Sequence, residues 1–158
     1  MLKKALVILF FTAWLVFSAG ADLTFNLPNL EGKTVSLADY LGQKITLVSF
    51  FTSWSKSCQS ELSWLKELNE KYQDSKLQII SISFDRDEKE LQAYVAKNKL
   101  GFEVLHDKKL TTLKDFKVLV IPTLFVFDLK GKLKNIYVDF DKNVEQAVET
   151  ELAKLIRT

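Results

Sequence analysis

The chain has 158 residues, with 22 Lys and Arg against 20 Asp and Glu, and the two signs balance once the two lysines near its start are set aside. A neutral chain with dispersed charges gives no reason to expect nucleic acid or an anionic membrane surface as a partner. Its single cysteine excludes an internal disulfide. One cysteine with one histidine falls short of a four-ligand zinc site, so neither a metal nor a cofactor is expected.

The first residues have the order of a secretory signal. Lys3 and Lys4 precede an uncharged apolar run over residues 5–17, and small residues follow at 18–21. The run is shorter than the roughly 20 residues that a membrane-spanning helix needs. We therefore expect a signal peptide over 1–21, an exported protein in a periplasmic or other extracytoplasmic compartment, and a single domain over 22–158. An uncleaved anchor through residues 5–19 is the alternative.

Alternating strand and helix patterns follow along the chain. Turn residues around short alternating segments predict an N-terminal hairpin and lead-in loop over 22–44. The apolar run at 45–51 predicts a strand buried on both faces. Further strands are expected at 77–84, 102–105, 124–128 and 133–138, and helices at 57–73, 88–98, 110–116 and 143–156. This order predicts a three-layer α/β fold with a central mixed sheet and helices on both faces.

The junction between the strand at 45–51 and the next helix carries Ser55-x-x-Cys58, directly after Trp54. In a C-x-x-C pair at such a turn, the positive end of the helix dipole lowers the pKa of the first thiol, which attacks, and the second thiol resolves the mixed disulfide. Serine has no comparable ionisation near neutral pH. The chain as written therefore cannot complete a dithiol cycle, although the turn lies where α/β sheets form their sites.

Ser55 and Cys58 each have a structural and a functional interpretation. Serine caps helices well, by about 1 kcal/mol over alanine. This interpretation is favoured over a serine nucleophile, because the only histidine, His106, follows a distant strand. Cys58 is either a thiol packed into the first helical turn or a monothiol that forms mixed disulfides with partner proteins. Pro122, at the start of a strand pattern, raises the chance of a cis bond.

Two segments far apart in the chain carry a family resemblance. The opening "FNLPNLEGKTVSLADYLGQKITLVSFFTSWSKSC" resembles that of exported TlpA/ResA-type thiol–disulfide oxidoreductases, a thioredoxin-like family related to the AhpC/TSA redoxins, in which a hairpin and strand lead into F-W-A-T-W-C-x-x-C. The later segment "VLVIPTLFVFDLKGKL" resembles the part where a cis-proline precedes a strand and a D-x-x-G-K turn. The resemblance covers most of residues 23–157 and implies a thioredoxin-like fold with an N-terminal β-hairpin extension.

The resemblance implies a role for each matching residue. Cys58 falls on the resolving cysteine, and Ser55 falls on the position of the attacking cysteine. Ser49 stands where cytoplasmic thioredoxins carry a buried acid, so the proton-handling carboxylate of that branch is absent from this position. The positions that bind substrate in the family, namely the tryptophan before the motif, the residue before the cis-proline and the cis-proline itself, are filled by Trp54, Ile121 and Pro122.

Three functions remain open, and whether the chain is an enzyme is one of the questions between them. The first is an exported thiol–disulfide oxidoreductase of the TlpA/ResA type, acting on disulfides of exported proteins but redox-impaired or monothiol. The second is a non-enzymatic module that binds peptides or partner proteins on the same fold. The third, a one-cysteine peroxidase, is disfavoured because Phe51 replaces the proline of P-x-x-x-[TS]-x-x-C and the only arginines are Arg86 and Arg157. The expected partners are exported protein thiols, disulfides or peptides, with no membrane partner after signal cleavage.

Overall fold

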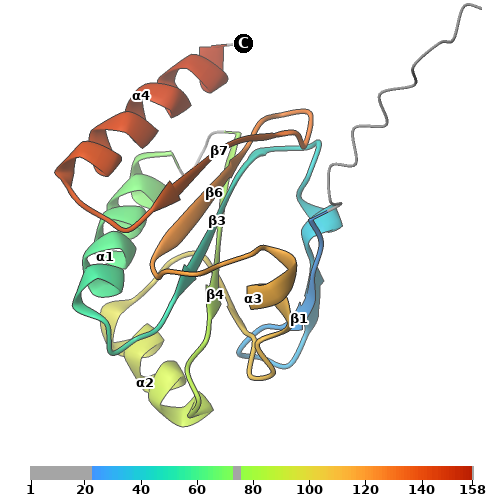
Figure 1. The fold of residues 1–158 in the computed structure, drawn as a ribbon, viewed down its shortest axis with the longest axis vertical. Coiled ribbons are helices and arrows are strands. Elements are labelled where there is room, and N and C mark those ends of the chain that lie inside the picture. Colours follow the sequence, from blue (N-terminus) through green and yellow to red (C-terminus); the bar gives the residue numbers. More distant parts are fainter. Residues whose placement is uncertain (1–22, 73–75, 158) are drawn as a thin grey trace, which may run out of the picture.

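A five-stranded mixed sheet forms the centre of the computed structural model, which describes residues 23–72 and 76–157 (Figure 1). Its central strands run parallel, and the two strands at one edge run antiparallel to their neighbours. In spatial order the strands are β5 (Glu103–His106), β4 (Leu77–Ser83), β3 (Ile45–Phe51), β6 (Thr123–Phe127) and β7 (Leu133–Val138). This is the mixed sheet that the sequence predicts.

Strand β3 lies in the middle of the sheet because every one of its residues can be buried. All of them are, and their side chains alternate between the two faces. Leu47 and Phe51 pack into the hydrophobic cluster on one face, and Val48 and Phe50 pack into the cluster on the other. Burial of apolar area on both faces, at about 25 cal/mol per Å², stabilises the strand in this central position.

Three helices cover the first face of the sheet, namely α1 (Lys56–Lys71), α2 (Glu88–Asn98) and α4 (Lys142–Arg157). The apolar side chains of α1 recur at three-residue intervals, so that Leu62, Leu65 and Leu68 face the strands together. In Figure 1, α1 and α4 lie to the left of the sheet. Helix α1 therefore begins at the end of β3 and returns along the sheet.

The second face is covered by the N-terminal hairpin and by α3 (Thr111–Asp115). The hairpin pairs β1 (Asn26–Pro28) with β2 (Thr34–Ser36), as predicted for this region. A short 3-10 helix, η1 (Leu37–Asp39), was not expected and is held by a capping box between Ser36 and Asp39. The aromatic centre of this face consists of Phe25, Phe50, Phe116 and Phe125.

Most predicted elements are found within two residues of their expected ends. The expected end of the first helix at Gln73 and the signal peptide over 1–21 lie outside the described residues. In the ranges that are described, no helix combines the length and the apolar character that crossing a membrane would require.

Candidate functional site

The turn between β3 and α1 is closed by a helix cap. Ser55 has an extended backbone (φ −79°, ψ 126°), and its hydroxyl oxygen accepts a hydrogen bond from the backbone N–H of Cys58 at 3.4 Å. A cap in this position satisfies one of the amide groups that the first helical turn leaves without a partner. Ser55 is therefore the N-cap of α1, as the structural interpretation predicts.

The sulfur of Cys58 lies inside the protein. The residue is 0% exposed and belongs to the cluster between α1 and the sheet. Burial raises the pKa of its thiol, against the lowering effect of hydrogen bonds from Ser55 and from the backbone of Thr52; the charges of Glu61 and Asp85 add to the increase. The thiol is thus protonated near neutral pH and shielded from solvent, which matches the packed interpretation rather than a reactive thiolate.

Asp85 holds the turn in place from the end of β4. Its carboxylate, 5% exposed, accepts hydrogen bonds from the backbone N–H of Ser53 (3.0 Å), from the Ser53 hydroxyl (3.0 Å) and from the Ser83 hydroxyl (2.7 Å). Its backbone carbonyl is bonded to Nε2 of the buried His106 at 2.8 Å. His106 therefore supports the turn through Asp85 and does not face Ser55 as a base.

The two motifs that lie far apart in the sequence meet at the same end of the sheet. Thr123 pairs with Phe50 in β3, so Pro122 lies beside the start of the turn, and the Ile121–Pro122 peptide bond is cis. Asp139 joins the two parts: its backbone N–H donates to the Pro122 carbonyl (2.8 Å), and its carboxylate accepts from the Ser57 hydroxyl (2.8 Å). The structure thus places the proline next to the first turn of α1.

Glu61 is a buried acid that the sequence interpretation missed. It lies one turn after Cys58 on α1, it is 0% exposed, and one carboxyl oxygen accepts a hydrogen bond from Ser49. The other oxygen has no protein partner among the described residues. Burial raises the Glu61 pKa to about 8; the bond from Ser49 opposes this increase, and the charge of Asp139 adds to it. Position 49 carries no acid, as expected, but a buried carboxyl that was not expected is supplied to the same site by Glu61 of α1.

A signal for Glu61 was present in the helix pattern. Cys58, Glu61, Leu65 and Leu68 follow one another at three- and four-residue spacing, so they share the face of α1 that meets the sheet. A glutamate on an apolar stripe must be neutral or paired when it is buried. This position distinguishes Glu61 from the exposed acids of the same helix.

The residues predicted to bind a substrate differ in how far they reach solvent. Trp54 is 74% exposed on the outer side of the turn, Ile121 is half-buried, and Pro122 is buried. Of these three residues, only Trp54 presents most of its side chain to solvent. In the part of the chain that the structure describes, no group of three His, Cys, Asp or Glu side chains is placed to hold a metal ion.

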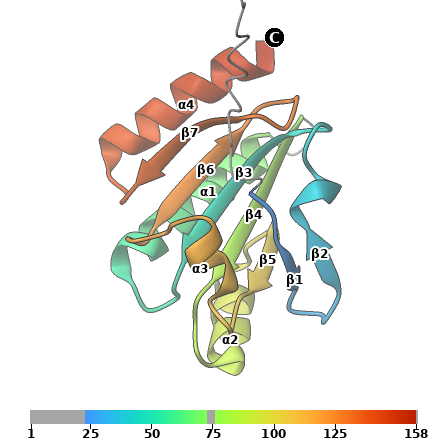
Figure 2. The ribbon, with the colours of Figure 1, turned by 45° about the vertical axis from the view of Figure 1, so that its right-hand side comes forward.

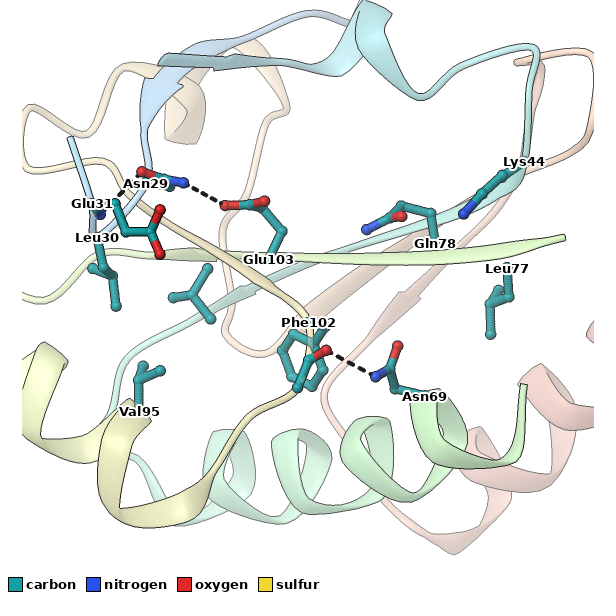
Figure 3. A pocket seen from close by; sticks show the side chains of 12 residues that line it. Asn29, Leu30, Glu31, Lys44, Asn69, Leu77, Gln78, Val95, Phe102 and Glu103 are labelled. Atoms are coloured by element: carbon teal, nitrogen blue, oxygen red, sulfur yellow. Dashed lines mark hydrogen bonds between the residues drawn. The ribbon is translucent and has the colours of Figure 1, made fainter. Parts of the chain in front are cut away.

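A separate hollow of about 610 Å³ lies at the opposite end of the parallel strands (Figure 3). Lys44 and Leu77, which lie at the starts of β3 and β4, are among its lining residues. Two of its polar side chains are engaged in hydrogen bonds: Asn29 donates to the Glu103 carboxylate, and Asn69 donates to the Gly101 carbonyl, each at 3.0 Å. This hollow therefore lies at the other end of the strands from the turn and is separate from it.

A cis-proline beside a helix that begins with an S-x-x-C turn, on a mixed sheet of this order, defines a thioredoxin-like protein of the redoxin class. Comparison with known proteins makes the assignment specific. The AhpC/TSA family matches residues 21–136, and the chain belongs to this family, as a member of the ResA/DsbE-type thiol–disulfide oxidoreductases.

The curated relatives support this placement. Thioredoxin-like protein YneN of Bacillus subtilis is 32% identical over 132 residues, which is 80% of this chain and 76% of that protein. Thiol-disulfide oxidoreductase ResA of Bacillus thuringiensis is 32% identical over 109 residues, or 69% of this chain, and the match spans 62% of ResA. The chain thus matches somewhat less than two thirds of the length of ResA.

A solved structure shows the same fold. A candidate thiol:disulfide interchange protein DsbE from Chlorobium tepidum has a TM-score of 0.78 and 26% sequence identity, and the match covers 84% of this chain and 93% of that one. The family and the fold are therefore established together, and the question that remains is what the S-x-x-C turn does.

Proposed function

We propose that this chain is an exported member of the ResA type that has kept the frame of the site and lost dithiol exchange. The observation that carries the proposal is the pairing of Ser55, which caps α1, with Cys58, which is 0% exposed. Export is part of the proposal and rests on the signal pattern of residues 1–21, which N-terminal sequencing of the secreted protein would test.

Thiol–disulfide exchange needs a thiolate that can reach the disulfide it attacks. The hydroxyl of Ser55 cannot replace such a thiolate, because it forms no disulfide. Cys58 is in the resolving position, and both its burial and the raised pKa of its thiol oppose attack on an external disulfide. The residues that shape the site, Asp85 and Asp139 among them, are nevertheless all in place.

Reduction of insulin disulfides, with dithiothreitol as the electron donor, tests this proposal. We expect the wild-type chain to give no acceleration over dithiothreitol alone and Ser55→Cys to give clear turnover. The matched control is the double variant Ser55→Cys/Cys58→Ser; reduced and then mixed with insulin after removal of the dithiothreitol, it should attack an insulin disulfide, release one insulin thiol and accumulate as the mixed disulfide. Wild-type turnover equal to that of Ser55→Cys would show that Ser55 does not limit the reaction.

A second candidate, a non-enzymatic polypeptide-binding module, is favoured by one observation. Trp54, next to Ser55 in the turn, is 74% exposed and available for contact. Exposed tryptophans are frequent energetic centres of binding surfaces. The module would hold a peptide without any covalent step.

The binding of a reduced, carboxymethylated polypeptide, followed by fluorescence anisotropy, tests the second candidate. Cys58→Ala should bind as the wild type does, and Trp54→Ala should bind about tenfold more weakly, the loss expected for a moderate hot spot. Equal binding by wild type and Trp54→Ala would remove this candidate.

The third function, a one-cysteine peroxidase, finds no support in the geometry. A peroxidatic cysteine needs an accessible thiolate, whereas Cys58 is buried and the pKa of its thiol is raised. Stoichiometric peroxide should leave Cys58 unoxidised by mass spectrometry.

A further inference from the structure

The sheet face that carries α3 is incompletely covered at its β7 edge. The hairpin and α3 pack over the other strands, but Ile136 and Val138 of β7 remain 44% and 53% exposed. A groove of about 500 Å³ lies there, between β7 and the loop that joins α3 to β6, and its lining is mainly apolar. Figure 2 shows α3 and this loop in front of the sheet.

The loop contributes the most exposed apolar side chain of this face. Leu119 is 93% exposed and Val120 is 47% exposed, and both line the groove. Leu110 and Leu113, at 45% and 37%, extend the apolar surface along α3. Side chains of this size are not left in water over a continuous segment without a reason.

Positive charge is concentrated in the same segment. Residues 108–120 contain one exposed acid, Asp115, and four exposed lysines, namely Lys108, Lys109, Lys114 and Lys117. The neighbouring acid, Asp107, is 1% exposed and accepts hydrogen bonds from Thr111 and Thr112, so its charge is turned inward. This local excess of positive charge is not apparent from the net charge of the whole chain.

The chain also enters the described structure at this groove. Leu23, the first described residue, lines the groove together with Lys117 and Leu119. The sequence before it includes the apolar run at 5–17. Leu23 therefore adds an apolar side chain from the N-terminal end of the described residues to the lining of this groove.

We propose that residues 108–120 and the groove beside β7, together called the docking face, bind the surface of an anionic lipid bilayer. Leu119 and its apolar neighbours would enter the interface, and the four lysines would contact the headgroups. Segments that lie in the membrane interface typically combine exposed apolar side chains with lysines. The neutral net charge of the chain gave no reason to expect an anionic membrane as partner. The proposal differs because a lipid surface is attracted by a local cluster of lysines, whatever the net charge of the whole chain.

The test uses the exported chain after signal cleavage, with a fluorophore at Leu119→Cys, and vesicles that contain brominated lipids. Cys58 is 0% exposed and is left unlabelled, which mass spectrometry verifies. The matched control carries the label at Gln92→Cys, which is exposed on α2 on the opposite face. The vesicles are either mixed phosphatidylglycerol and phosphatidylcholine or phosphatidylcholine alone.

We expect quenching at position 119 but not at position 92, only with phosphatidylglycerol, and weaker at high salt. Changing the four lysines of the docking face to Gln should raise the lipid concentration for half-maximal quenching several hundredfold, since each of the four lysines contributes about fivefold. A variant with Lys44, Lys89, Lys97 and Lys99 changed to Gln, all of them exposed elsewhere, should behave as the wild type.

Two outcomes would overturn the proposal. Equal quenching at positions 119 and 92 would show that the docking face does not meet the lipid, which would leave the groove to a protein partner. Quenching at position 119 that survives the loss of the four lysines, or that is as strong with phosphatidylcholine alone, would show that anionic lipid is not what this face recognises.

Discussion

Ser49, in the middle of β3, donates a hydrogen bond to the carboxyl group of Glu61, one turn into α1. The acid comes from α1, one turn after Cys58, and not from the strand, where Ser49 supplies only the hydrogen-bond donor. Because burial raises the Glu61 pKa to about 8, the group is mainly neutral at pH 7 and can hold a proton inside the site.

The pH dependence of stability should report Glu61 directly. Its pKa is raised from 4.5 to about 8 on folding, so the folded state retains a proton that the unfolded state loses. The stabilisation is therefore complete below about pH 4.5 and is lost as the pH rises through 8. At about 1.4 kcal/mol for each pH unit, the loss is at most on the order of 5 kcal/mol.

Glu61→Gln removes this titration and keeps an acceptor for Ser49. We expect the difference in unfolding free energy, wild type minus variant, to decrease steadily between pH 5 and pH 8 in urea denaturation. Glu67→Gln, on the exposed side of the same helix, is the control and should leave the wild-type pH profile in place. A Glu61→Gln difference that does not change with pH would contradict the buried neutral acid.

Ser55→Ala should destabilise the fold modestly. It removes the cap of α1, which typically costs 0.5–2 kcal/mol, and the long hydrogen bond of 3.4 Å favours the lower part of that range. We expect a loss of about 0.5–1 kcal/mol by chemical denaturation. Ser55→Asp, which also accepts from the helix N-terminus, should recover most of it, and no effect of either change would argue against the cap.

Alkylation of Cys58 by iodoacetamide should be slow in the folded protein. The thiol is 0% exposed and its pKa is raised above 9.0, so both access and ionisation limit the reaction. We expect a rate at least about a hundredfold below that of the unfolded chain, increasing with denaturant, because reaction then requires opening. Ser55→Cys provides the contrast, since position 55 is half-exposed and should react readily. Rapid alkylation of the wild type at pH 7 would mean that Cys58 is reachable.

Asp85 and Ser53 should show strong energetic coupling. Two hydrogen bonds of 3.0 Å join them, and bonds to a charged group contribute about 1.5–3 kcal/mol. A double-mutant cycle with Asp85→Asn and Ser53→Ala should yield about 1.5–3 kcal/mol for the side-chain bond, which is the one that Ser53→Ala removes. Additive effects of the two changes would indicate that the turn is held by other contacts.

The elements that the sequence predicts well are those with long, regular patterns. The strand at Ile45–Phe51 has no residue that must face water, and the helix at Lys56–Lys71 has an apolar stripe, so local pattern and tertiary burial agree. Figure 1 shows β3 within the central sheet and α1 to the left of the sheet. Because both elements could be predicted, the position of the turn between them could be predicted as well.

What the sequence concealed depended on contacts between distant residues. The burial of Glu61 requires Ser49 opposite it, and the support of the turn requires Asp85, which lies 32 positions after Ser53. The open groove at β7 depends on which strand the N-terminal hairpin leaves uncovered. The 3-10 helix after β2 is different, because its capping box, Ser36 and Asp39, was visible in the sequence.

The bonds that hold the turn have a consequence for how this lineage can change. Asp85 accepts hydrogen bonds from Ser53, and Asp139 is bonded both to Ser57 and to the carbonyl of Pro122. None of these hydrogen bonds involves the side chain at position 55. A cysteine there would enter a scaffold that is already assembled. One amino-acid replacement separates this protein from a two-cysteine site, and the step can be taken in either direction without rebuilding the fold.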